Sequence, residues 1–175
     1  MALLIVVSGP PGAGKSTVAR ALADKFERSV LVGGDAFFAF LARGAIAPWL
    51  PAAHGQNEVV TGAAAAAAGR YVAGGYVTVY DGVVGPWLLA EFVAAAGVER
   101  LHYAVLLPAV EQCIERVASR TGHGFTDESA TRHMHRQFAQ ASIDQRHVLA
   151  DPPGPAEETA QDILERTRSG ALRYP

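Results

Sequence analysis

The sequence has 175 residues, of which 50% are hydrophobic and 18% are charged, and its formal net charge is −2. This composition excludes the disordered and fibrous classes, and the absence of a basic block argues against nucleic acid or an anionic membrane as a partner. We therefore expect one globular domain over residues 1–175. Cys113 is the single cysteine, so we expect a small core residue rather than a disulfide, and a cytoplasmic protein.

The first predicted strand, residues 2–8, leads into a glycine-rich segment and then a helix extending to about residue 27. Its apolar run is typical of a strand that is covered on both faces. The segment fits the pattern G-x-x-x-x-G-K-[ST] and consists of Gly9, Pro10, Pro11, Gly12, Ala13, Gly14, Lys15, Ser16 and Thr17. Glycines let backbone N–H groups surround a phosphate, and the N-terminus of the following helix adds further N–H groups.

Two side chains of this segment carry the expected chemistry. Lys15 is expected to reach the β- and γ-phosphates of a nucleotide, and the Ser16 hydroxyl is expected to ligate Mg²⁺. The alternative is a glycine-rich turn that only permits tight packing. Because a buried strand precedes the segment and a helix follows it, the pattern favours nucleotide binding.

The middle of the chain alternates strands and helices around one long irregular segment. Its expected elements are a strand at 30–32, a helix at 36–42, an irregular segment at 43–57, a helix at 58–73, a strand at 76–80 and a helix at 86–96. The irregular segment is longer than a routine connection, and long segments of this kind tend to be functional. An alanine run, residues 63–68, suits close packing of its helix on the sheet.

The last part of the chain continues the alternation. Its expected elements are a strand at 101–107, helices at 109–120 and 128–141, a strand at 147–150 and a helix at 156–168. Alternating strands and helices predict βαβ units and a parallel sheet in a three-layer α/β fold. Ligands of such sheets bind beyond the carboxyl ends of the strands.

Two carboxylates follow strands at this edge. Asp81 ends an apolar strand and is expected to hold Mg²⁺ beside Ser16; the alternative is a turn-forming Asp before Gly82. Asp35 follows the second strand and is expected to orient an acceptor hydroxyl and take its proton, although it is also a suitable N-cap for the next helix.

Arginines cluster around residues 116–136. Arg116 and Arg120 lie four residues apart and so share a helix face; we assign Arg116 to nucleotide binding and Arg120 to stabilising the transferred phosphoryl group from a mobile flap, about residues 116–140. For Arg132 and Arg136 a solvated surface is the favoured interpretation.

Residues of the irregular segment are candidates for an acceptor site, which we place within about 36–75. Trp49, His54 and Asn57 combine polar groups with an aromatic wall, which suits a small hydroxylated ligand. The alternative is a surface loop with Trp49 in the core. The remaining histidines show no spacing typical of a metal site.

Taken together, these motifs resemble the small P-loop kinases, a group that includes shikimate kinase, gluconate kinase, nucleoside monophosphate kinases and chloramphenicol phosphotransferase. The resemblance rests on Gly9 to Thr17, on Asp35, on Arg116 to Phe125, which ends in Arg-Thr-Gly-His-Gly-Phe, and on Asp151 to Pro155. It implies a five-stranded parallel sheet of order 2-3-1-4-5 with a helical lid. It also implies that Arg120 is the lid arginine and that the loop containing Pro153 contacts adenine.

The sequence departs from two members of this group. Asp81-Gly82-Val83-Val84 lacks the Gly-Gly-Gly run of shikimate kinases, and residues 36–57 lack an arginine arrangement for a nucleoside monophosphate. We therefore expect an ATP- and Mg²⁺-dependent kinase that phosphorylates a hydroxyl of a metabolite, sugar acid or antibiotic. The alternatives are a cytidylate-type nucleoside or nucleotide kinase and an ATP-binding switch with slow hydrolysis. The sequence leaves the oligomeric state open.

Overall fold

The computed structural model describes residues 2–119, 125–152 and 154–174. Its strands are β1 (Leu3–Ser8), β2 (Ser29–Gly33), β3 (Val77–Asp81), β4 (Leu101–Leu106), β5 (Val148–Leu149) and β6 (Arg173–Tyr174). Its α-helices are α1 (Lys15–Ala23), α2 (Gly34–Phe38), α3 (His54–Ala73), α4 (Pro86–Ala96), α5 (Val110–Ala118), α6 (Glu128–Gln140) and α7 (Ala156–Ser169). Short 3₁₀ turns, η1 (Pro51–Ala53) and η2 (Gln145–His147), precede α3 and β5.

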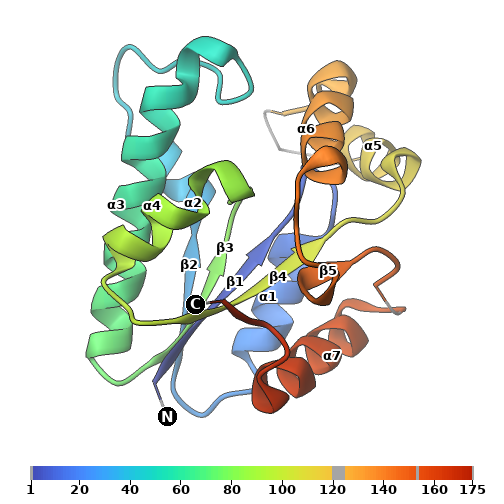
Figure 1. The fold of residues 1–175 in the computed structure, drawn as a ribbon. Helices are drawn as coiled ribbons and strands as arrows, with labels where there is room; N and C mark the ends of the chain where they lie inside the picture. The colour runs from blue at the N-terminus through green and yellow to red at the C-terminus, as the bar shows by residue number, and fades with distance from the viewer. Residues whose placement is uncertain (1, 120–124, 153, 175) are drawn as a thin grey trace.

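The sheet has the order β2-β3-β1-β4-β5, and all pairings along this path are parallel. This confirms the expected strand order and the three-layer class. Figure 1 shows α3 and α4 on one face of the sheet and α1 and α7 on the other. An addition that the sequence did not predict is β6, which pairs antiparallel with the start of β4.

The two faces of β1 explain why its sequence is a continuous apolar run. Ile5 and Val7 pack in the core cluster that contains α1 and α7, whereas Leu4 and Val6 pack in the cluster that contains α3 and α4. Side chains alternate along a strand, so a central strand covered on both faces needs apolar residues at every position. Part of the alanine run of α3 lies in the second cluster, where small side chains allow the helix to approach the sheet.

Three helices differ most clearly from the bounds expected from the sequence. Helix α1 ends at Ala23 rather than near residue 27; the Ser29 hydroxyl donates to the Ala23 carbonyl, and the partly buried Phe26 packs against the core. Helix α2 spans only Gly34–Phe38. Helix α3 begins at His54, four residues earlier than expected, so the irregular segment is shorter. Among the described residues, no helix is both long and apolar enough to span a membrane.

Candidate active site

The register of three strands brings the predicted residues to one edge of the sheet. Asp81 pairs with Val7 of β1 on one side and with Gly33 of β2 on the other. The glycine-rich segment therefore begins near the level of Asp81. Asp35, which comes two residues after Gly33, lies at the same edge of the sheet. The Ser8 hydroxyl donates to the Val84 carbonyl at 2.9 Å and accepts from the Val84 amide at 3.0 Å, which ties the end of β1 to the turn after β3.

The glycine-rich segment has the conformation that its glycines were expected to allow. Gly9, Gly12 and Gly14 all have positive φ angles, of 140°, 78° and 94°. A Cβ on Gly12 would also overlap the Cys113 carbonyl, so α5 packs directly against the loop backbone. Cys113 is fully buried, as expected, and burial raises the pKa of its thiol. The loop therefore bends sharply before α1 and leaves the helix N-terminus open toward a ligand.

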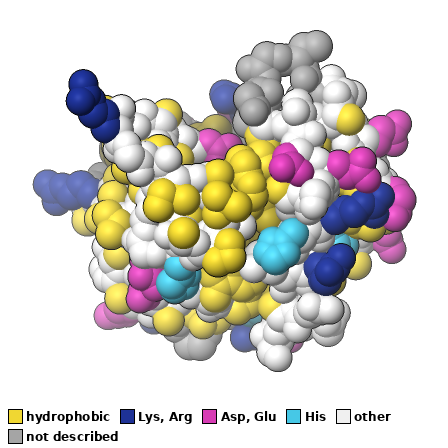
Figure 2. Space-filling view, turned by 90° about the horizontal axis from the view of Figure 1, so that it is seen from above, with side chains coloured by type: hydrophobic (Ala, Val, Ile, Leu, Met, Phe, Trp, Pro, Cys, Tyr) yellow, Lys and Arg dark blue, Asp and Glu magenta, His cyan; other side chains and the backbone are white. Residues whose placement is uncertain are grey.

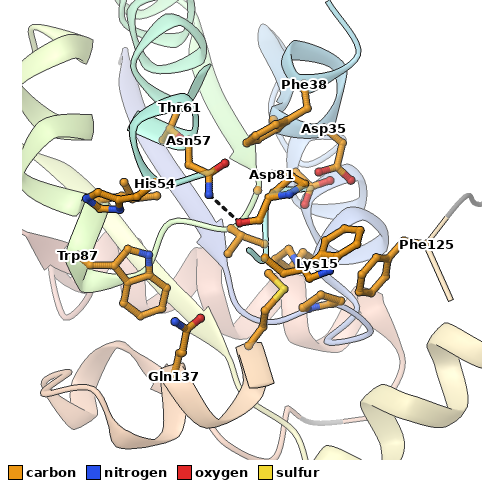
Figure 3. A pocket seen from close by; sticks show the side chains of 18 of the residues that line it. Lys15, Asp35, Phe38, His54, Asn57, Thr61, Asp81, Trp87, Phe125 and Gln137 are labelled. Atoms are coloured by element: carbon orange, nitrogen blue, oxygen red, sulfur yellow. Dashed lines mark hydrogen bonds between the residues drawn. The ribbon is translucent and has the colours of Figure 1, made fainter. Parts of the chain in front are cut away.

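Lys15 and Ser16 face the larger of two cavities at this edge. The Lys15 ammonium group donates to the Pro10 carbonyl at 2.9 Å, so its side chain folds back over its own loop. Both residues line a cavity of about 640 Å³ together with Asp35 and Asp81. Figure 3 shows Lys15, Asp35 and Asp81 on the same side of this cavity. The structure thus brings together the residues assigned to phosphate, metal and acceptor.

Asp35 is exposed at the cavity and does not cap a helix. Helix α2 begins at Gly34, its N-cap is Gly33, and no side chain caps it, so the N-cap alternative for Asp35 is wrong. Asp35 instead lies in the first helical turn, beside the buried ring of Tyr80. Burial, followed by the negative charges of Asp35 and Asp81, raises the pKa of Tyr80, so its hydroxyl stays protonated and can donate.

The acceptor residues predicted in the irregular segment all line the large cavity. Trp49 lies in the segment itself, whereas His54 and Asn57 lie in the first turn of α3. His54 contacts the Glu58 carboxylate at 2.9 Å and is mostly exposed. The Asn57 amide nitrogen donates to the Pro48 carbonyl at 2.7 Å, which leaves its carboxamide oxygen buried without a hydrogen-bond partner.

A second side-chain amide, that of Gln56, binds the same irregular segment. The Gln56 side chain accepts from the Ile46 amide at 2.8 Å and donates to the Ile46 carbonyl at 2.7 Å. Together with Asn57, it attaches residues 46–48 to α3 through three hydrogen bonds. This attachment holds Trp49 at the cavity, where its ring meets that of Phe125 at 4.8 Å between centroids. The core alternative for Trp49 is therefore wrong.

Several residues of this cavity were missed by sequence reasoning. They come from α2, α3, β3, α4 and α6: Phe38, Thr61, Tyr80, Trp87, Leu88, His133, Met134 and Gln137. On α6, the sequence did contain a signal that residues 134, 137 and 138 lie together: residues three and four apart share one face of a helix. The sequence gives no indication that this face meets α4, where Phe138 packs against Trp87.

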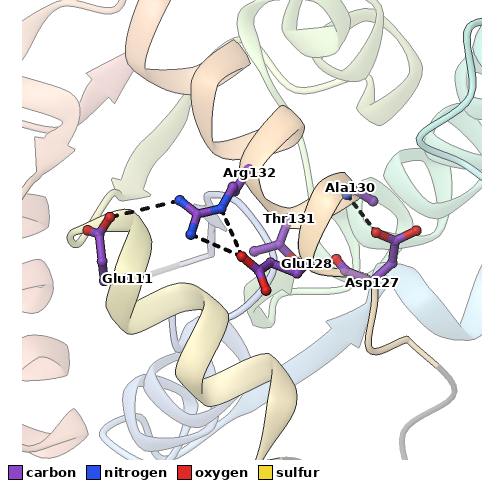
Figure 4. A network of polar contacts seen from close by, with 6 residues as sticks. All are labelled: Glu111, Asp127, Glu128, Ala130, Thr131 and Arg132. Carbon is purple, nitrogen blue, oxygen red and sulfur yellow. Dashed lines mark hydrogen bonds and ion pairs between the residues drawn. The ribbon is translucent and has the colours of Figure 1, made fainter.

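Arg132 takes part in a network of polar contacts between α5 and α6, as Figure 4 shows. Its guanidinium group contacts the Glu128 carboxylate at 3.0 Å and the Glu111 carboxylate at 3.9 Å, and so links α6 to α5. Asp127 caps α6 by accepting from the Ala130 amide at 2.9 Å. These contacts support the surface interpretation of Arg132, and neither Arg132 nor Arg136 lines the cavity.

A second cavity, of about 400 Å³, lies on the other side of the glycine-rich segment. Gly12, Gly14 and Arg116 line it, and so do Asp151, Pro152 and Gly154 of the loop before α7. The Arg116 guanidinium donates to the Gly12 carbonyl at 3.4 Å. The loop around residues 151–154 therefore lies next to the phosphate-binding loop. Arg120 and Pro153, which were also predicted as site residues, lie outside the described residues.

The donors at the larger cavity fit a magnesium ion that is held mainly by phosphates and water. Ser16 and Asp81 supply one hydroxyl and one carboxylate. Among residues 2–119, 125–152 and 154–174, no group of three or more His, Cys, Asp or Glu side chains is placed to hold a metal. Mg²⁺ in phosphoryl-transfer sites takes only one or two protein ligands in addition to phosphate oxygens and water.

The strand order, the bent glycine-rich loop and the paired cavities define a P-loop fold of the kind found in small kinases. The family model for the AAA domain matches residues 4–142. The chain belongs to this AAA domain family.

Solved structures of similar fold include three whose length the chain matches almost fully. The tunicamycin resistance protein of Deinococcus radiodurans has a TM-score of 0.70 at 13% identity, covering 100% of this chain and 99% of that one. A sugar kinase from Janibacter sp. HTCC2649 has a TM-score of 0.71 at 17% identity, covering 96% and 95%. A gluconokinase from Sinorhizobium meliloti has a TM-score of 0.64 at 23% identity, covering 97% and 94%. These likenesses concern the fold.

Among curated proteins, a cytidylate kinase from Halobacterium salinarum is 54% identical over 35 residues. The matched stretch covers 20% of this chain and 18% of that protein. This similarity is confined to a short segment.

Proposed function

We propose that this protein transfers the γ-phosphoryl group of ATP, with Mg²⁺, to a hydroxyl group of a small molecule. The observation that carries the proposal is one cavity of about 640 Å³ in which Lys15 and Ser16 of the phosphate-binding loop lie with Asp35 and Asp81. A phosphate donor and an alcohol acceptor that share this cavity would meet beside both carboxylates.

The loop and its lysine would hold the nucleotide. Backbone amides of the loop and the N-terminus of α1 would bind the β-phosphate, and Lys15 would leave the Pro10 carbonyl to contact the phosphates. Ser16 and Asp81 would hold Mg²⁺ or its water ligands, and the bound ion would neutralise charge on the β- and γ-phosphate oxygens. The second cavity, beside Arg116 and Asp151, would take the remainder of the nucleotide.

Asp35 would act on the acceptor. Its carboxylate is exposed in the cavity and would accept a hydrogen bond from the acceptor hydroxyl, which aims the oxygen lone pair at the γ-phosphorus. As the new oxygen–phosphorus bond forms and the bond to the β-phosphate oxygen breaks, the hydroxyl proton would pass to Asp35. ADP is the leaving group. Arg120 is proposed, from its place in the sequence, to stabilise the charge on the transferred group.

The segment shared with a cytidylate kinase supports a second candidate, a nucleoside or nucleotide kinase. A nucleoside monophosphate brings a phosphate that needs cationic partners. Among the described residues that line the large cavity, Lys15 is the one lysine or arginine, and it is assigned to ATP. This composition favours an acceptor other than a nucleotide.

ATP consumption in the presence of a library of hydroxyl compounds tests the proposal. The library should contain nucleosides, nucleoside monophosphates, sugars, sugar acids and hydroxylated antibiotics, and each product should be identified by mass spectrometry. We expect at least one non-nucleotide compound to stimulate ATP consumption and to appear as its phosphate ester. Hydrolysis that no compound stimulates would contradict the proposal and favour an ATP-binding switch.

A further inference from the structure

We infer that the acceptor carries no acidic group and that its body is largely apolar and contains at least one ring. This inference rests on the proposed function and narrows its substrate class. It follows from the charges that line the large cavity and from its aromatic wall.

The charges at the cavity disfavour an acidic acceptor. Asp35 and Asp81 contribute two carboxylates, whereas the described lining residues contain one lysine, Lys15, and no arginine. Once ATP and Mg²⁺ occupy the loop, Lys15 pairs with the phosphates, and the negative charges of the triphosphate, Asp35 and Asp81 still outnumber the positive charges of Mg²⁺ and Lys15. Among the described lining residues, no further lysine or arginine remains to pair with a carboxylate or phosphate on the acceptor.

Large apolar side chains form much of the cavity wall. Phe38, Trp49, Trp87, Phe125 and Met134 come from five separate parts of the chain and converge on the cavity. Trp87 is 40% exposed and Leu50, also in the lining, is 47% exposed, so both present apolar surface that a ligand would cover. Figure 2 shows hydrophobic side chains gathered in the middle of this face, with histidine and acidic groups around them.

The polar groups of the lining are set among these apolar side chains. The amide nitrogen of Asn57 is committed to the Pro48 carbonyl, whereas its buried oxygen has no hydrogen-bond partner and can accept from a ligand hydroxyl. A hydroxyl placed against the aromatic side chains would have no partner, so a sugar acid with hydroxyls at every carbon fits poorly. An aromatic or alicyclic group, by contrast, gains contact area with Trp49 and Trp87.

Matched pairs of hydroxy acids and their methyl esters test this inference. The probes are 3-phenyllactate, its naphthyl and cyclohexyl analogues, and the methyl ester of each, so that each pair differs in one negative charge. Both tryptophans of the chain line the cavity, so their fluorescence reports occupancy of the site. Titrations use the full chain with Mg²⁺ and a non-hydrolysable ATP analogue.

We expect at least one ester to bind with a Kd at least about tenfold lower than that of its acid. Acids that bind as tightly as their esters, or esters that leave the fluorescence unchanged up to their solubility limits, would overturn the inference. Calorimetry should show ester binding weakened at least about fivefold by Trp49→Ala. It should show no change with the control Val59→Ala, because Val59 is 72% exposed on α3 and does not line the cavity. Equal effects of the two variants would also overturn it.

The two proposals fail in different ways. Ester binding without phosphoryl transfer to any hydroxyl compound would refute the kinase and leave the selectivity of the cavity intact. Rapid phosphorylation of gluconate or another hydroxy acid would support the kinase and refute the present inference.

Discussion

Two glycines of α3 give a matched test of how closely α3 packs against α4. Gly69 lies against the end of α4, where an added Cβ would be 2.7 Å from the Ala96 carbonyl carbon and would overlap the carbonyl oxygen. Gly62 lies two turns earlier, and there an added Cβ would meet the Ala95 Cβ at 3.9 Å, an ordinary contact. Both helices line the cavity, through Thr61 and Trp87.

The expected effects of alanine at these positions have opposite signs. Replacing glycine by alanine inside a helix stabilises it by about 1 kcal/mol. At Gly62 this gain should appear almost fully, because the new methyl group fits. At Gly69 the methyl group overlaps the Ala96 backbone, which cannot move aside as a flexible side chain can. Overpacking of this kind costs about 1–3 kcal/mol. Since the overlap is severe, the upper part of that range applies, and the net loss at Gly69 should be about 1–2 kcal/mol.

Urea unfolding followed by circular dichroism measures both effects. Gly62→Ala should raise the midpoint and Gly69→Ala should lower it, with the slope m unchanged in each case. The melting temperature should shift by about 2–4 °C for each kcal/mol. If Gly69→Ala proved as stable as Gly62→Ala, the close approach of α3 and α4 would be refuted.

Three further predictions concern the site, the histidines and the surface. Asp35→Asn should lower kcat about 10²- to 10⁴-fold while ATP binding, measured by calorimetry, stays unchanged; loss of ATP binding would make Asp35 structural. Burial is the largest cause that lowers the pKa of both His102 and His147 in the folded protein. These histidines therefore resist protonation when folded, whereas in the unfolded chain they protonate near pH 6.5. The free energy of unfolding should therefore fall as pH drops below about 6.5, and denaturation midpoints that stay constant down to pH 5 would contradict this. Arg132→Ala should change the free energy of unfolding by no more than about 1 kcal/mol, because its ion pairs are exposed, and a larger loss in urea titrations would argue against this.

The phosphate-binding loop and the strand order were predictable from the sequence. The loop is a local motif whose glycines, lysine and serine must be contiguous, and the resemblance to small kinases supplied the order of the sheet. Asp35 and Asp81 were correctly placed at one edge, because each follows a strand and parallel strands end together.

The large cavity was predicted only in part, because its wall is assembled by tertiary packing. Trp87 and Met134 lie on helices that are far apart in sequence, and their convergence depends on how α6 packs on α4. His54 and Asn57 were expected in a loop, because the His, Gly and Asn of the sequence His-Gly-Gln-Asn are poor helix formers. The structure places them on a helix because Gln56 and Asn57 bind the preceding segment.

The central claim is that Lys15 holds a triphosphate in the cavity where Asp35 orients an alcohol. The most direct measurement is transfer of labelled γ-phosphate from ATP to the acceptor found in the library, for the wild type and for Lys15→Ala. The account predicts that transfer by Lys15→Ala falls at least about 10²-fold. Transfer by Lys15→Ala at close to the wild-type rate would contradict it.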